Sequence, residues 1–478
     1  MWTSSRDYLM LAMLAMPQAA HFAVAERVLG VYIFARHGDR TPKIQGNTQL
    51  TDLGYSEVFM TGSYYHSRYI DSNSSLQIDG ISTDIVNLKQ LSAAAPSDAV
   101  LQNSATGFLQ GVYPPVGTMA SQELANGTTV DAPLNGYQLV PLSLTTSGTN
   151  SEDNTWLQAT TKCQKAKVSS NSYYSSTLYK DLLASTQDFY TSFTPVLEGQ
   201  FPTSDISFKN AYPIFDYLNV ARIHNTSTEN MPTDAQFHQL LTLANIEQYN
   251  LAYNSTETVR AIAGAQLAGE MLDGLRETIS TQGKTKLNIQ FGSYGTFLSY
   301  FGLAQLPAAN TDFTGIPDYA SSMAWELITD STSGFPDPAD ISVRFIFHNG
   351  TITSSDEPTE FALYGQSSAT IPWSEFEKQT KNIAVMSTEE WCSACGNTDG
   401  KCASSSSDSA GAQSTDSNNN GISNAVAGVI GAMVTLGVIL GLGLVFFLLG
   451  GFTIAKKRKT GAASISSDAT ETKFVEHS

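Results

Sequence analysis

The sequence is poor in basic residues: it has 26 lysines and arginines against 44 aspartates and glutamates, and its formal net charge is −18. Proteins that bind nucleic acid need a basic stripe to neutralise phosphates, so this shortage excludes nucleic acid as a partner. Charged residues of either sign make up only 15% of the chain, and 41% of its residues are hydrophobic. A disordered chain would carry more charge, so the composition predicts a globular protein.

Cysteine is also scarce, with Cys163 alone and Cys392, Cys395 and Cys402 in one C-terminal cluster. In a cytosolic protein the C-x-x-C spacing would indicate a redox or zinc site, but no histidine accompanies the cluster as a further zinc ligand. In a secreted protein the four residues indicate two disulfides. Three pairings are possible, and the sequence does not choose among them. We expect no bound metal and no cofactor.

Two apolar segments predict how the chain meets the membrane. Residues 1–25 have one basic residue, an apolar stretch and the A-x-A sequence Ala23-Val24-Ala25, which predicts a signal peptide rather than a buried N-terminal helix. Residues 424–455 carry no charge and exceed the roughly 20 residues that cross a bilayer, which predicts a single transmembrane helix. Four basic residues, 456–459, follow directly and predict a cytoplasmic side there.

The rest of the chain divides around these segments. Residues 403–423 are rich in serine, asparagine and glycine and predict a flexible stalk, and residues 456–478 form the cytoplasmic tail of a type I protein. Residues 26–402 are expected to fold as an ectodomain at the cell surface. Its N-x-S/T sequences predict N-glycosylation on surface loops at Asn73, Asn126, Asn225, Asn254 and Asn349.

Strand-like and helical patterns alternate within the ectodomain. The run RVLGVYIFARHG (27–38) is apolar on both faces, as in a buried parallel strand, and residues 285–293 and 341–351 are also strand-like. Long helical stretches lie between the first two runs, at 159–186 and 254–280. The alternation predicts an α/β fold with a central, mainly parallel sheet flanked by helices. A smaller, mainly helical inserted domain is expected roughly within residues 105–280.

A cluster of basic residues follows the first predicted strand. Arg36 and Arg40 can present forks of donors to a tetrahedral oxyanion, and Gly38 lets the backbone approach closely. His37 is a potential nucleophile toward phosphorus, and the flanking guanidiniums disfavour its protonated form. Ligands of α/β sheets bind beyond the carboxyl ends of strands, where this cluster lies. A surface loop could hold the same residues, so the cluster alone specifies no function.

The longer sequence RHGDRTP (36–42) resembles the R-H-G-x-R-x-P signature of the histidine acid phosphatases, which belong to the phosphoglycerate mutase-like superfamily. Further similar segments are 50–69 and 104–115, and, toward secreted fungal members of the family, 319–327, 343–351 and 391–396. The resemblance implies a phosphoglycerate mutase-like fold and a phosphomonoester or inorganic phosphate as ligand. It also implies that His37 forms a phosphohistidine, with Arg36 and Arg40 binding the phosphoryl oxygens.

The chain departs from that family at two places. The family has a third arginine four residues before the S-A pair, where Val100 stands here, and a His-Asp pair after a late strand, where Tyr294 and Gly295 stand. In the family this histidine binds phosphate and the aspartate protonates the leaving alcohol, and losing a general acid slows a reaction roughly 10²–10⁴-fold. His224 and His348 are interpreted as surface or structural residues rather than replacements.

Three hypotheses follow from these features. The first is a membrane-anchored acid phosphatase with altered or reduced activity. The second is a pseudoenzyme that binds phosphate or a phosphoester without hydrolysing it. The third is a structural cell-surface glycoprotein, which the intact signature at residues 36–42 disfavours. The family resemblance favours the first, and the substitutions keep the second close behind.

Overall fold

The computed structural model describes residues 26–145, 162–226, 229–353 and 355–403. The predicted signal peptide, most of the predicted stalk, and the whole of the transmembrane helix and cytoplasmic tail lie outside these residues. Within the described ranges, no helix is both long and apolar enough to cross a membrane.

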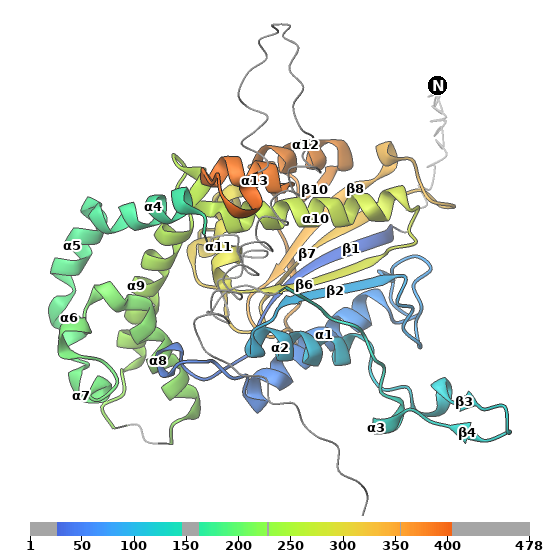
Figure 1. Ribbon diagram of the computed structural model, residues 1–478, viewed down its shortest axis with the longest axis horizontal. Helices are drawn as coiled ribbons and strands as arrows, with labels where there is room; N and C mark the ends of the chain where they lie inside the picture. The colour runs from blue at the N-terminus through green and yellow to red at the C-terminus, as the bar shows by residue number, and fades with distance from the viewer. Residues whose placement is uncertain (1–25, 146–161, 227–228, 354, 404–478) are drawn as a thin grey trace, which may run out of the picture. The chain divides into compact units, whose positions relative to one another are not determined.

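An eight-stranded sheet forms the centre of the fold (Figure 1). In spatial order its strands are β10 (Thr370–Pro372), β8 (Ser342–His348), β7 (Ser322–Thr329), β1 (Arg27–Arg36), β6 (Leu287–Gly292), β2 (Leu91–Pro96) and β5 (Ser143–Thr145), with β9 (Thr359–Glu360) paired to β8. Pairing is parallel from β1 through β6 and β2 to β5, and antiparallel from β1 through β7 and β8 to β10. The predicted α/β class is confirmed, and its sheet is mixed rather than mainly parallel.

Strand β1 is buried on both faces, as its apolar run predicts. Tyr32 and Phe34 belong to one apolar cluster, which includes residues of α10 (Ile262–Ser280) and α11 (Tyr294–Leu303). Ile33 and Ala35 belong to another, which includes residues of α1 (Asp52–Tyr69) and α2 (Ala99–Val112). Helices therefore cover both faces of the sheet, and β1 carries the residues that follow it into the middle of the molecule.

Between β5 and β6 the described residues, from 162 onward, contain helices and no strand. Before α10 these are α4 (Gln164–Ser172), α5 (Thr177–Ser185), α6 (Gln187–Thr191), α7 (Thr194–Leu197), α8 (Ala211–His224) and α9 (Asp234–Ala252). The region predicted to be a helical insertion starts earlier, at about residue 105, but its first part continues α2. That part then holds α3 (Pro133–Gly136), the hairpin of β3 (Gln122–Glu123) and β4 (Thr129–Val130), and β5.

Two disulfides join the four cysteines, which confirms the predicted disulfide bonding. Cys163, just before α4, pairs with Cys395, and Cys392 pairs with Cys402. Cys392 and Cys395 both lie on α13 (Thr388–Cys395), which follows α12 (Trp373–Ile383). The first bond ties the start of the helical region to the C-terminal end of the described chain. The glycosylation sites stay predictions: Asn254 is half-buried, and the other four asparagines are exposed.

The two disulfides differ in the length of chain that they close, which gives a direct test. Removing the Cys163–Cys395 bond, which spans 232 residues, should lower the free energy of unfolding by about 2–5 kcal/mol. The matched control is Cys392→Ser with Cys402→Ser, because this bond spans 10 residues and constrains the unfolded chain less. Urea denaturation of the full-length protein measures both. A larger loss in the control would contradict this account.

Candidate active site

The residues singled out in the sequence meet at the carboxyl end of β1. Arg36 is the last residue of β1, and its register partner Gly292 ends the parallel neighbour β6. Tyr294 begins α11 immediately afterwards. The signature loop also packs tightly on the start of α1, because a Cβ added to Gly38 would lie 2.1 Å from the carbonyl oxygen of Gly54. A side chain at position 38 would therefore displace the loop.

A hydrogen bond of His37 shows which of its two ring nitrogens carries a hydrogen. Its Nδ1 lies 2.8 Å from the carbonyl oxygen of Gly38, which can only accept, so Nδ1 carries a hydrogen. In the neutral ring Nε2 is then the nitrogen with the lone pair, which is the form a nucleophile needs. The His37 side chain has no exposed surface, and the ring of Tyr319 lies 5.6 Å from it, centroid to centroid.

Arg36 lies between two aromatic rings. Its guanidinium carbon is 5.4 Å from the ring centre of Tyr294 and 4.8 Å from that of Tyr319. The guanidinium also donates to the carbonyl oxygen of Pro317. The residue is only 4% exposed, and its Nε has no hydrogen-bond partner among the described residues. Cation–π contacts leave N–H groups available, so Arg36 can still donate to an oxyanion.

Arg40 is engaged by a carboxylate from the helical region. Its two terminal nitrogens lie 2.9 and 3.2 Å from the oxygens of Asp216 on α8, and one of them is 3.2 Å from the hydroxyl of Tyr212. Asp216 also accepts the main-chain N–H of Lys43 at 2.9 Å. Both partners of the ion pair are buried. A phosphoryl group at Arg40 would therefore compete with a carboxylate already in the guanidinium fork.

Asp39, within the signature, makes the second contact with α8. Its Oδ2 lies 2.6 Å from Nε2 of His224, the last residue of that helix, and accepts the hydroxyl of Thr51 at 2.5 Å. The Asp39 main-chain N–H donates to Glu57 on α1 at 2.7 Å. Burial raises the pKa of Glu57 to about 7, and this N–H opposes the shift. His224 thus has a partner inside the signature.

The substituted family positions carry no charge. Val100 is fully buried in the apolar cluster around α2. An arginine at this position would place its charge among apolar side chains. The ring of Tyr294 lies 4.8 Å from that of Tyr212, centroid to centroid. The hydroxyl of Tyr294 donates to the side chain of Gln248 at 2.9 Å. Gly295 supplies no carboxyl group. The structure therefore gathers tyrosine rings where the resemblance implies a His-Asp pair.

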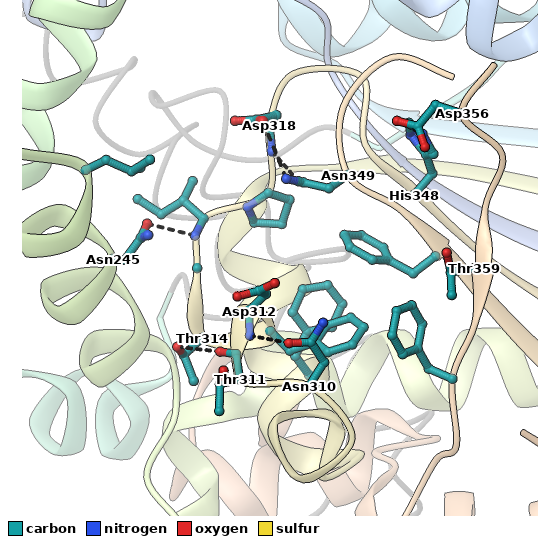
Figure 2. Close-up of a pocket in the computed structure, with 18 of the residues that line it drawn as sticks. Asn245, Asn310, Thr311, Asp312, Thr314, Asp318, His348, Asn349, Asp356 and Thr359 are labelled. Atoms are coloured by element: carbon teal, nitrogen blue, oxygen red, sulfur yellow. Dashed lines mark hydrogen bonds and ion pairs between the residues drawn. The ribbon is translucent and has the colours of Figure 1, made fainter. Parts of the chain in front are cut away.

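A cavity of about 610 Å³ is drawn in Figure 2. It is lined by Pro317, whose carbonyl oxygen accepts from Arg36, and by the next residue, Asp318. Phe301, Phe313, Phe347 and Phe361 form an apolar wall, and Asp312, Asp356 and Glu357 are acidic lining residues. His348, at the end of β8, has its Nε2 3.3 Å from Asp356 and its Nδ1 2.9 Å from the carbonyl oxygen of Gly350. No lysine or arginine in the described parts of the chain lines the cavity.

Several residues at this site were missed by sequence reasoning. They are Tyr212, Asp216, Tyr319 and Asp318. Asp216 had one signal, since it interrupts an apolar helical stretch between Phe215 and Tyr217. A buried aspartate at such a position needs a cation as partner. The other three carry no pattern that would set them apart.

The model of the histidine phosphatase superfamily (branch 2) matches residues 43–348, more than half of the chain. The chain belongs to this superfamily. The signature at residues 36–42 lies outside the matched residues, so it is independent evidence for the same superfamily. None of the curated proteins compared with the chain matches it. The finer resemblance to secreted fungal members stays a prediction.

Among the solved structures that are similar to this chain, a phytase supports the fold. A phytase of Klebsiella sp. ASR1 is 11% identical with a TM-score of 0.52, over 75% of this chain and 96% of that one. The phytase of Citrobacter braakii is 13% identical with a TM-score of 0.49, over 77% and 99%. The multiple inositol polyphosphate phosphatase of Bifidobacterium longum is 10% identical with a TM-score of 0.44, over 77% and 94%. At these identities a likeness concerns the fold alone. Of the three TM-scores, that of the Klebsiella phytase supports the fold.

Two carboxyl groups that accept main-chain N–H groups of site residues make the free energy of unfolding depend on pH. Burial raises the pKa of Glu247 to about 7, although the main-chain N–H of Tyr212 donates to it. An unfolded glutamate titrates near 4.5, so the native state binds the extra proton between these values. This stabilisation is complete below about pH 4.5 and is lost as pH rises through about 7. Glu57 acts in the same direction.

We therefore expect the melting temperature of the wild type to fall from about pH 5 to about pH 8, and to fall less in Glu247→Gln, which cannot ionise. Thermal unfolding followed by fluorescence measures both. Glu198→Gln, at an exposed position, is the control for loss of one negative charge and should keep the wild-type slope. An unchanged slope in Glu247→Gln would show that this carboxyl does not bind the proton.

Proposed function

We propose that this protein is a cell-surface phosphomonoesterase that works through a phosphohistidine at His37, with activity reduced by the substitutions around the site. The observation that carries the proposal is the hydrogen bond from His37 Nδ1 to the Gly38 carbonyl oxygen, between two arginines of an R-H-G-x-R-x-P signature. Membership of the histidine phosphatase superfamily supports it. The names of similar structures, phytases among them, point to phosphate esters.

In the proposed reaction, the lone pair of His37 Nε2 attacks phosphorus while the bond to the leaving oxygen breaks. Arg36 stabilises the charge on the phosphoryl oxygens, and Arg40 joins it once Asp216 has been displaced. The phosphohistidine is then hydrolysed by water, which releases inorganic phosphate and restores the neutral ring. The leaving oxygen also needs a proton, which must come from a further acid or from solvent because Gly295 supplies no carboxyl group.

Three features reduce the rate. The substituted positions remove an arginine and a general acid, and each such loss costs about 10²-fold or more. These losses are not additive within one site. The aromatic rings of Tyr294 and Tyr319 lie against Arg36, and His37 has no exposed surface, so a substrate must move part of this cover before reaching the nucleophile.

A phosphate-binding pseudophosphatase is the second candidate, and the Arg40–Asp216 pair favours it. A carboxylate that fills the fork of a phosphate-binding arginine lowers the affinity for the transferred group in every state. Under this alternative the site would bind inorganic phosphate weakly without turnover. Placement at the cell surface depends, under either function, on the predicted signal peptide and transmembrane helix.

Activity decides between the two candidates. The full-length protein should hydrolyse p-nitrophenyl phosphate in mildly acidic solution, and His37→Ala should reduce the rate by at least about 10³-fold, since the nucleophile is lost. His238→Ala, at an exposed position on α9, is the matched control and should keep wild-type activity. Hydrolysis that persists in His37→Ala would mean that another nucleophile or a contaminant is responsible.

Anion binding tests the role of Asp216. Tungstate should raise the melting temperature of the wild type, because a ligand that binds only the native state stabilises it. Asp216→Asn should enlarge this shift, since the amide leaves the Arg40 fork without a competing charge, and Arg40→Ala should reduce it. Equal shifts in the wild type and in Arg40→Ala would show that Arg40 does not hold the anion.

A further inference from the structure

One segment touches both the phosphoryl site and the neighbouring cavity. Pro317 lines the cavity, and its carbonyl oxygen accepts from Arg36. Tyr319 packs on Arg36 and on His37. Asp318, between these two residues, lines the cavity as well. A group bound in the cavity could therefore contact Asp318, and both chain neighbours of Asp318 contact Arg36.

The main chain at Asp318 is firmly fixed. Its N–H donates to the side chain of Asn349 at 2.8 Å, and its carbonyl oxygen accepts the Ser321 hydroxyl at 2.6 Å. The carboxyl has only a long contact of 3.4 Å, from the Asn349 amide. Figure 2 shows Asp318 beside Asn349 at one edge of the cavity. The carboxyl therefore keeps exposed surface and is free to meet a ligand.

Desolvation, rather than neighbouring charge, favours the protonated form of the Asp318 carboxyl. The surrounding protein keeps water from part of this group, which raises its pKa above the usual value, and the Arg36 guanidinium opposes the shift. Glu57 of α1 also interacts with it. Among the described residues, the remaining charged or titratable groups that line the cavity are Asp312, Asp356, Glu357 and His348.

The other proton donors near His37 are less suitable. Glu57 already accepts the Asp39 main-chain N–H and does not line the cavity. Burial raises the pKa of the Tyr319 phenol, which makes it a weaker acid. The Tyr294 hydroxyl donates its hydrogen to Gln248. Within the segment 317–319, Asp318 is the residue with a carboxyl group, and it lines the cavity.

We propose that Asp318 is the proton donor to the leaving alcohol and that the adjoining cavity binds that alcohol. This rests on the proposed function, because it requires the phosphohistidine at His37. As the bond from phosphorus to the alkyl oxygen breaks, that oxygen takes the Asp318 proton and leaves as a neutral alcohol. The Asp318 carboxylate then takes a proton from the water that attacks phosphorus, the phosphorus–Nε2 bond breaks, and inorganic phosphate leaves.

The cavity also selects the class of alcohol. Its phenylalanine wall suits an apolar or sugar-like face, and Asn245, Asn310 and Thr311 offer hydrogen bonds to hydroxyl groups. Its acidic lining residues repel further phosphate groups, and no lysine or arginine of the described residues lines it to offset that repulsion. The substrate class is therefore a monophosphate of an uncharged polyhydroxy alcohol, not an inositol polyphosphate.

The test compares two leaving groups in the full-length protein. Glycerol 2-phosphate needs an acid because an alkoxide leaves poorly, whereas p-nitrophenolate departs without help. Asp318→Asn should lower kcat for the glycerol ester by about 10²-fold or more, and the first-turnover burst of p-nitrophenolate should change by less than about threefold. Asp318→Glu should recover part of the loss. Asp330→Asn, at an exposed position at the end of β7, should leave both rates unchanged.

Two further readouts separate an acid from a merely structural residue. The fall of kcat/KM for the glycerol ester on the alkaline side should disappear in Asp318→Asn, because no carboxyl remains to ionise. Inositol hexakisphosphate should be hydrolysed at least about 10-fold less efficiently than glycerol 2-phosphate by the wild type. A p-nitrophenolate burst that slows in Asp318→Asn as much as kcat for the glycerol ester, or no loss in either quantity, would overturn the inference. Wild-type hydrolysis that does not depend on His37 would overturn the proposed function with it.

Discussion

The arrangement around the site depends on the buried ion pair of Arg40 and Asp216. Taking both charges out of water costs several kcal/mol per ion, and this cost is offset only when the remaining donors and acceptors are also satisfied. Asp216 meets that condition, since it accepts from the Arg40 fork and from the Lys43 main chain. An unpaired Arg40 would destabilise the loop after β1, so the pair fixes α8, and with it the helical region, against the sheet.

The same pair makes the two arginines of the signature unequal. Arg40 has its charge neutralised by a carboxylate, whereas Arg36 is stabilised by aromatic faces, which neutralise nothing and occupy no N–H group. An incoming phosphoryl group therefore meets an available positive charge at Arg36 and a competitor at Arg40. Arg36 also contacts the cavity wall through Pro317. First contact with a substrate should occur on that side of His37.

The sequence predicted the parts of the fold that depend on local patterns. The apolar run of β1, the placement of Arg36 and His37 at its end, the α/β class and the disulfide bonding all follow from residues close in the chain or from composition. Pairing direction did not, because β7 is as fully buried as β1 and burial on both faces is the same signal for parallel and antiparallel neighbours. Asp216 and Asp318 lie 176 and more than 270 residues from Arg40, and no local pattern connects them.

Position 295 and position 318 would affect the pKa of a carboxyl acid in opposite directions. A carboxyl at position 295 would stand in the first turn of α11, where the helix N-terminus stabilises negative charge and lowers a carboxyl pKa. Asp318 lies instead on a loop at the edge of the cavity, where desolvation raises its pKa. A donor at Asp318 keeps its proton to higher pH than one at the helix end. The glycine at position 295 thus fits an enzyme whose acid approaches the leaving group from the cavity side of His37.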